Sequence, residues 1–179
     1  FAGTRTFNLD EYVGLPASDP HSYRHYMQKH LFRLVDVDLR QATLRNTILG
    51  HSVLKGMRLG GVIPETSSFE DSDLTGLLEW PARLIGLIFR RCHLEGLDLS
   101  GLDLTDCDLS AAHLERTRFV GATLINVNLR KACLAGADLS EADLSGALAA
   151  GADLTGARLV DARLSGTELV AADLGDADL

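Results

Sequence analysis

One residue recurs every five positions between Cys92 and Leu179, and this period restricts the fold more than any other feature of the chain. Sixteen of the eighteen recurrent positions hold Leu, one holds Phe and one holds Ala. A smaller residue, most often Ala, precedes each of them by two positions, as in Ala137-Asp138-Leu139-Ser140-Glu141. We call the first position the central site and the second the small site. Internal repeats of this kind decide the architecture before local propensity does.

A period of five fits neither a regular helix nor a flat strand. Five residues of an α-helix advance by about 140° net, so the central leucines would scatter around the axis. On a strand, an odd spacing sends successive leucines to opposite faces. All of them can point inward only if the chain bends once per unit, always in the same direction, which predicts a solenoid of stacked coils. Glycines that suit such corners are Gly101, Gly121, Gly136, Gly146, Gly151, Gly156 and Gly166.

On these repeated units, the chain resembles the pentapeptide-repeat proteins. The resemblance implies an all-β solenoid in the form of a right-handed quadrilateral β-helix, with four units in each coil. It also implies that the central and small sites point inward and that the other three positions of each unit point outward. The expected core is Leu94, Leu99, Leu104, Leu109, Leu114, Phe119, Leu124, Leu129, Leu134, Leu139, Leu144, Leu154, Leu159, Leu164, Leu169 and Leu174.

The repeat divides the chain into three parts. Residues 1–31 form an N-terminal extension with a short helix that caps the solenoid, begun by Ser18-Asp19-Pro20. Residues 32–91 form irregular coils, with loop interruptions near 60–68 and 76–88, and residues 92–179 form the regular β-helix. Pro64 and Glu79 break the run of central residues, yet the phase is the same on both sides. We therefore expect the interruptions to replace or insert whole units rather than to shift the register.

Bulky residues occupy several small sites in the middle of the chain. Leu77, Leu87, Leu97 and Leu102 stand there in place of Ala. Extra volume in a packed interior is strained. We expect a widened or irregular cross-section between about Gly76 and Leu102.

The three cysteines have neither the spacing of a metal site nor that of a disulfide framework. Cys92 and Cys107 fall on small sites and are predicted to be buried thiols, whereas Cys133 falls on an outward position. Free thiols favour a reducing compartment. His21 and His25 have the i, i+4 spacing of a metal pair but no convincing third ligand, so we read them as part of the capping helix. We predict no metal and no cofactor.

No pattern in the chain indicates catalysis or a membrane span. No apolar run approaches the roughly 18 residues that a membrane helix needs, and no secretory signal opens the chain. A nucleophile elbow and a phosphate-binding glycine loop are both missing, and the carboxylates recur with the repeat. We predict a protein that is not an enzyme. The expected location is the bacterial cytoplasm, or delivery from it as part of a secreted effector.

The negative charge gathers in the regular coils. From Arg90 onward there are fifteen Asp and Glu against eight Lys and Arg, a net charge of −7 out of −8 for the whole chain. Direct binding to nucleic acid is disfavoured, because it requires a basic surface. An acidic wall instead suits a protein partner with a basic groove. The candidate partner-binding residues are Asp98, Asp103, Asp138, Asp143, Asp153, Asp173 and Trp80.

Three of these candidates, Asp98, Asp138 and Trp80, also have structural interpretations. With four units per coil, residues twenty apart lie above one another, so Asp98, Arg118 and Asp138 would alternate in sign along one wall. Opposite charges in this file would pair across adjacent coils and stabilise a solvent-exposed wall. This structural interpretation is simpler than a partner-binding one. Trp80 is either a loop anchor packed on the solenoid or an exposed partner contact.

We therefore predict a non-catalytic protein-binding scaffold with a rigid acidic surface, alone or as a module of a larger bacterial effector or secretion-associated protein. The resemblance adds an alternative, because the family includes quinolone-resistance proteins that resemble DNA in shape and charge and occupy topoisomerases such as gyrase. The long loop insertions and C-terminal dimerising helix expected of that subgroup are not evident here. The chain stops in mid-repeat at Leu179, which leaves three readings open: a C-terminal continuation, truncation of a longer protein, or a homodimer through the open C-terminal coil.

Overall fold

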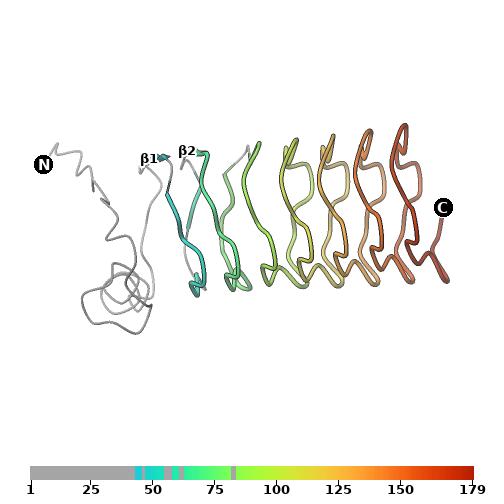
Figure 1. The fold of residues 1–179 in the computed structure, drawn as a ribbon, viewed down its shortest axis with the longest axis horizontal. Helices are drawn as coiled ribbons and strands as arrows, with labels where there is room; N and C mark the ends of the chain where they lie inside the picture. The colour runs from blue at the N-terminus through green and yellow to red at the C-terminus, as the bar shows by residue number, and fades with distance from the viewer. Residues whose placement is uncertain (1–42, 46, 55–57, 61–62, 82–83) are drawn as a thin grey trace, which may run out of the picture.

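A computed structural model describes residues 43–45, 47–54, 58–60, 63–81 and 84–179, and there the chain winds into coils stacked along one axis (Figure 1). Parallel bridges join residues twenty apart in adjacent coils, such as His93 with His113 and Arg118 with Asp138. Twenty residues are four units, so each coil has four sides. The two strands, β1 (Thr43–Arg45) and β2 (Ile63–Glu65), pair in parallel at the same offset. The predicted capping helix within residues 1–31 lies outside the described residues.

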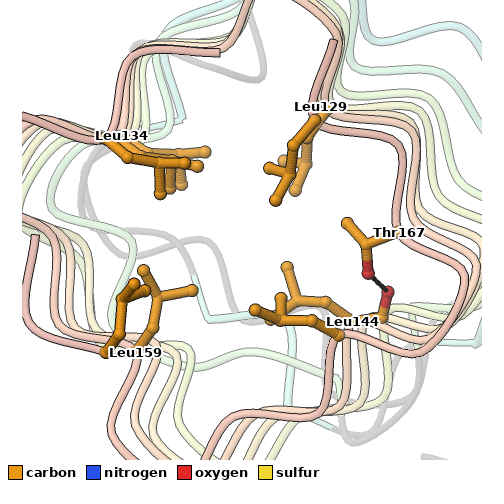
Figure 2. Close-up of a pocket in the computed structure, with 11 residues that line it drawn as sticks. Leu129, Leu134, Leu144, Leu159 and Thr167 are labelled. Carbon is orange, nitrogen blue, oxygen red and sulfur yellow. Dashed lines mark hydrogen bonds between the residues drawn. The ribbon is translucent and has the colours of Figure 1, made fainter.

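The central residues fill the interior from all four sides. Figure 2 looks into the coil, where Leu129, Leu134, Leu144 and Leu159 each point inward from a different side. Every central residue from Leu94 to Leu159 is at most 4% exposed. Leu164, Leu169 and Leu174 are only partly buried, because the last coil has a neighbouring coil on one side alone. The predicted core is therefore confirmed up to Leu159 and is more open beyond it.

A side chain at a small site lies close to a backbone carbonyl of the preceding coil. Ser, Thr and Cys can donate a hydrogen bond to that carbonyl, and Ala is small enough to fit there without one. Thr117 Oγ1 donates to the carbonyl of Leu94 at 2.8 Å. Cys92 and Cys107 donate in the same way to central-residue carbonyls 23 positions back, at 2.9 and 2.7 Å. A hydroxyl or thiol buried at this site therefore has a hydrogen-bond partner, and an alanine needs none. Both cysteines are buried as predicted, and Cys133 is partly exposed.

Each unit turns a corner two residues after its central site. The carbonyl of Leu109 accepts a hydrogen bond from the N–H of Ala112 at 3.1 Å, and Ala111 between them has a φ of 54°. An i to i+3 hydrogen bond with a left-handed third residue is the signature of a type II turn. All seven glycines predicted at corners have a φ between 63° and 71°. Four such turns per coil produce the four-sided section.

Pro64 does not interrupt the solenoid. It is buried at a central site within β2, and its Cα pairs with that of Leu44 in β1. β2 therefore lies in the stretch 60–68 that the sequence predicts as a loop. Other central residues, such as Phe69, donate their N–H to the following coil. Proline has no N–H to donate, and its pairing is to the preceding coil.

Glu79 causes a one-residue slip in the second predicted interruption. Arg58 bridges Glu79 at an offset of 21, whereas the other described bridges have an offset of 20. A central Glu would bury a carboxylate in the core, which is costly. The slip turns Glu79 outward, where Arg58 Nη1 donates to its carboxylate at 2.7 Å. The regular pairing has returned at Leu84, so the expectation that no interruption shifts the register is wrong at this point.

Trp80 fills the space that the slip leaves on the inner side. The side chain is partly buried and packs against the core. Its ring meets that of Phe89 edge to face, with centroids 6.2 Å apart. These contacts are those of an anchor on the solenoid, the first of the two interpretations of this residue.

Leucines at small sites are accommodated unequally. Leu77 and Leu87 are 6% and 1% exposed, whereas Leu97 and Leu102 are only partly buried. A side chain larger than Ala does not fit the inner corner at the latter two positions and stays nearer the surface.

In the part of the chain that the structure describes, no helix is long and apolar enough to cross a membrane.

Candidate functional site

The outward residue before each central site forms one of four files along the solenoid, with bridged residues directly above one another. One file runs through Asp73, His93, His113, Cys133, Asp153 and Asp173, and we call this side of the molecule the histidine wall. A second file, Asp98, Arg118, Asp138, Arg158 and Asp178, is called the alternating wall. The structure thus separates the predicted surface residues: Asp153 and Asp173 lie on the histidine wall, Asp98 and Asp138 on the alternating wall, and Asp103 and Asp143 on a third side.

The aspartates have a structural task that the sequence analysis missed. Asp138 Oδ1 accepts hydrogen bonds from the N–H of Ser140 at 3.2 Å and from its hydroxyl at 2.6 Å. The same pattern ties Asp143 to Ser145 and Asp153 to Thr155. An Asp that binds the backbone two residues on holds the chain in a turn. The recurring Asp-Leu-Ser/Thr is therefore explained by the corner, and it leaves one carboxylate oxygen for other contacts.

These turn contacts change the acidity of the aspartates. Hydrogen bonds from Ser140 hold the pKa of Asp138 below its ordinary value, and those from Ser145 do the same for the pKa of Asp143. Thr155 likewise lowers the pKa of Asp153. Donors aimed at a carboxylate stabilise its charged form. The walls therefore stay negatively charged to lower pH than free aspartates would.

Arginines neutralise much of the alternating wall. Arg118 Nη1 lies 3.4 Å from Asp98, and Arg158 lies 3.8 Å from both Asp138 and Asp178. Arg163 pairs with Asp143 at 3.6 Å on the third side. By contrast, Asp153 and Asp173 on the histidine wall are adjacent in their file and have no ion pair among the described residues. The charges of Asp153 and Asp173 are therefore not compensated by a described arginine or lysine.

Histidines and glutamates gather at the other end of the histidine wall. The rings of His93 and His113 stack in parallel, with centroids 4.5 Å apart and planes inclined by 3°. His93 Nδ1 lies 2.9 Å from Glu95 Oε1, and His113 Nδ1 lies 3.8 Å from Glu115 Oε1. The contact with Glu95 raises the pKa of His93. The sequence contains the signal for this cluster, since His-Leu-Glu occurs twice, twenty residues apart, but it was not recognised.

Two features inside the coil, an apolar cavity and a pair of buried thiols, also bear on function. The open end of the last coils encloses an apolar cavity of about 110 Å³, lined by leucines from all four sides and by Ala149 (Figure 2). The homodimer contact predicted at this end stays a prediction. Burial raises the pKa of Cys92 and of Cys107 to about 12, so neither thiol is a nucleophile at neutral pH.

Comparison with known proteins identifies the repeat. A family model described as pentapeptide repeats matches residues 82–110, 107–146 and 142–179 with eight copies, which is more than half of the chain. The described coils begin earlier, at β1, so the repeat structure extends beyond the part that the family model matches. The four-sided coil is the right-handed quadrilateral β-helix that the resemblance implied.

Solved structures and curated proteins add three similarities. A pentapeptide repeat protein from the Arabidopsis thaliana thylakoid lumen is 30% identical, with 50% of this chain and 66% of that chain covered and a TM-score of 0.42. A plasmid-mediated fluoroquinolone resistance protein is 21% identical over 76% of this chain and 74% of that chain, with a TM-score of 0.46. Glucosamine-6-phosphate deaminase of Shouchella clausii is 54% identical over 46 residues, 26% of this chain. The chain spans about a fifth of the length of that curated relative.

Proposed function

Because the chain belongs to the pentapeptide-repeat family, we propose that it is a non-catalytic scaffold that binds a protein partner through acidic residues of its walls. The partner presents a basic groove or segment. Electrostatic complementarity of this kind speeds association and selects the partner. The rigid, hydrogen-bonded coils hold the carboxylates at fixed spacing, so little conformational freedom is lost when the partner binds.

The observation that carries the proposal is the uneven neutralisation of the walls. Arginines pair with the aspartates of the alternating wall, whereas Asp153 and Asp173 have no such partner among the described residues. Paired charges on a solvated surface contribute little further attraction. The contact is therefore expected at the C-terminal end of the histidine wall, and the aspartates of the alternating wall are expected to matter less.

Substitution by Asn separates binding from folding, because an amide oxygen can still accept the turn hydrogen bond. Asn128 does so for the N–H of Arg130 at 3.3 Å. We expect immobilised wild-type protein to capture a basic partner from bacterial lysate, and the double variant Asp153→Asn/Asp173→Asn to lose it. The control Asp98→Asn lies on the alternating wall and should retain the partner. Equal capture by all three proteins, or capture that survives high salt, would contradict the proposal.

The alternative function is a topoisomerase-binding protein that protects against a poison. The net charge of −7 from Arg90 onward supports it. The ion pairs of Arg118, Arg158 and Arg163 count against it, since a surface that imitates DNA needs uncompensated negative charge. A DNA gyrase supercoiling assay, titrated with the protein with and without a quinolone, tests it. Salt-sensitive inhibition or rescue from the drug would favour this function over a scaffold for another partner.

No deaminase activity is proposed. The stretch that matches glucosamine-6-phosphate deaminase is 46 residues, 19% of the length of that protein. Catalytic sites are assembled from residues far apart in a fold, so a fifth of an enzyme rarely forms one. We expect no turnover of glucosamine 6-phosphate by this chain, and measurable turnover would overturn the non-catalytic part of the proposal.

A further inference from the structure

We propose that His93, Glu95 and His113 on the histidine wall form a binding site for a first-row transition metal ion such as Zn²⁺. Neither the family nor the proposed function assigns such a site. It stands whether or not the scaffold proposal does, because it rests on one cluster of side chains.

The three side chains converge from two successive coils. His93 and His113 are bridged partners in the file, and Glu95 follows His93 on the same side. One ligand atom from each lies within 4.8 Å of the other two, and this is the metal-compatible group found among the described residues. Two ligands of one Zn²⁺ at about 2.0–2.1 Å lie about 3 to 4 Å apart. The cluster is therefore close to the dimensions of a site before any ion binds.

A second observation favours the binding of a cation here. One carboxylate oxygen of Glu95 and one of Glu115 are buried and have no hydrogen-bond partner among the described residues. Buried polar atoms are normally satisfied, and an exception calls for an ion or a water. A cation held by His93 and His113 would be attracted to both glutamates. Glu115, beside Nδ1 of His113, is placed to orient that imidazole as metal sites commonly require.

Binding needs a modest rearrangement of the rings. Ring-nitrogen lone pairs lie in the plane of the ring, so two parallel imidazoles do not aim at one point. The side chains of His93 and His113 are 49% and 46% exposed, so their rings have room to tilt. The second side-chain torsion of histidine is broad and permits this motion. A shallow, open depression lined by Asp73, Thr75, His93 and Glu95 lies beside them, so the cluster is accessible from solvent.

The donor set selects the class of metal. Two imidazole nitrogens and one carboxylate oxygen suit Zn²⁺, Co²⁺, Ni²⁺ or Cu²⁺, whereas Mg²⁺ and Ca²⁺ prefer oxygen ligands alone. Asp73 is not counted as a ligand, because the ligand atoms that lie within 4.8 Å of one another come from His93, Glu95 and His113. Three protein ligands leave a tetrahedral position open to water or to a side chain of another protein.

Isothermal titration calorimetry of the full chain with Zn²⁺ near neutral pH tests the site. We expect one ion per chain that Mg²⁺ does not displace. Each of the variants His93→Gln, Glu95→Gln and His113→Gln should raise the Kd at least about tenfold, and Glu115→Gln should raise it by about tenfold. Co²⁺ bound to the wild type should give visible absorption bands that the His113→Gln variant loses. Circular dichroism of each variant verifies that the coil is intact.

Two controls exclude the other histidines. His51→Gln removes an exposed histidine that also has a nearby carboxylate, Asp71 at 3.4 Å, but lies away from the cluster. The triple variant His21→Gln/His25→Gln/His30→Gln removes the histidines of the N-terminal segment. Both should bind Zn²⁺ as the wild type does. Loss of the ion in either, or in Cys133→Ser, together with normal binding by His93→Gln, would overturn the assignment, as would the absence of any binding.

Discussion

At the scale of single residues, the corner is the feature that most constrains the choice of amino acid. Every described corner has a left-handed φ, and glycine is the residue that adopts it without strain. Among the residues that the structure describes, thirteen corner residues with positive φ are nevertheless not glycine, including Ala111 and Arg116. A left-handed residue with a Cβ costs about 1–2 kcal/mol relative to the right-handed form. The stacked coils supply hydrogen bonds that hold these residues in place, such as that from the N–H of Ala111 to Arg130 at 2.8 Å.

A reciprocal pair of substitutions measures this strain. A Cβ at Gly101 would meet no atom within 4 Å, so Gly101→Ala introduces strain without a clash. We expect it to lower the free energy of unfolding by about 0.5–1 kcal/mol, after the smaller unfolded-state entropy of alanine is allowed for. Ala111→Gly should raise it by a similar amount. Urea unfolding with an unchanged m-value provides the measurement. Two shifts of the same sign would show that backbone conformation is not the cause.

At the scale of one unit, the central and small sites differ in the volume they hold. Ala149 is the one alanine among the eighteen central residues from Leu94 to Leu179. It lines the apolar cavity near the end of the coil. Small sites do not always bury a larger side chain, since Leu97 and Leu102 stay partly exposed although Leu77 and Leu87 are buried. The two positions therefore should respond differently to the same side chain.

We expect Ala149→Leu to stabilise the solenoid by about 1–2 kcal/mol, because it buries three more carbons in an existing cavity. The matched control is Ala152→Leu, at a small site that is 1% exposed and already filled. Overpacking there should destabilise by about 1–3 kcal/mol. Thermal unfolding of both variants distinguishes them. Equal destabilisation would mean that the cavity cannot accept a leucine.

At the scale of the whole molecule, the coils act as a chain of like units whose contributions add along the axis. The turn carboxylates show this well, because the same contact recurs at Asp138, Asp143 and Asp153. In each of these the pKa is lower in the folded chain than its ordinary value near 3.9. A group with a lowered folded pKa stabilises the fold above its unfolded pKa and loses that contribution as pH falls through the folded pKa.

The contribution of these aspartates to the free energy of unfolding should therefore be constant above about pH 5. It should be lost progressively as the pH falls below about 4. Asp143→Asn keeps an oxygen for the turn but does not titrate. We expect the variant to lose less stability between neutral pH and about pH 3 than the wild type does. Chemical unfolding followed over this range checks the slope. An acid dependence identical to that of the wild type would assign the effect to other carboxylates.

The sequence by itself determined the architecture, because the same local pattern of a small and a central residue recurs in every five-residue unit. The period of five requires a bend per unit and predicts that Leu139, Phe119 and Cys107 lie inside, where the structure has them buried. The buried state of these side chains follows from their position in the unit. The four sides and the twenty-residue offset came from the resemblance, and the bridges confirm them.

Only the tertiary structure decided the side-chain orientations and contacts that depend on neighbouring coils. Glu79 turns outward through a one-residue slip, because the energy of a buried carboxylate is set by the coil that surrounds it. Pro64 stays within the stack, where its Cα pairs with that of Leu44 in the preceding coil. The twenty-residue offset already places His93 and His113 one above the other, but the stacking of their rings is decided by the tertiary structure. A local pattern carries no information about the orientation of such side chains, and their contacts make the proposed metal site.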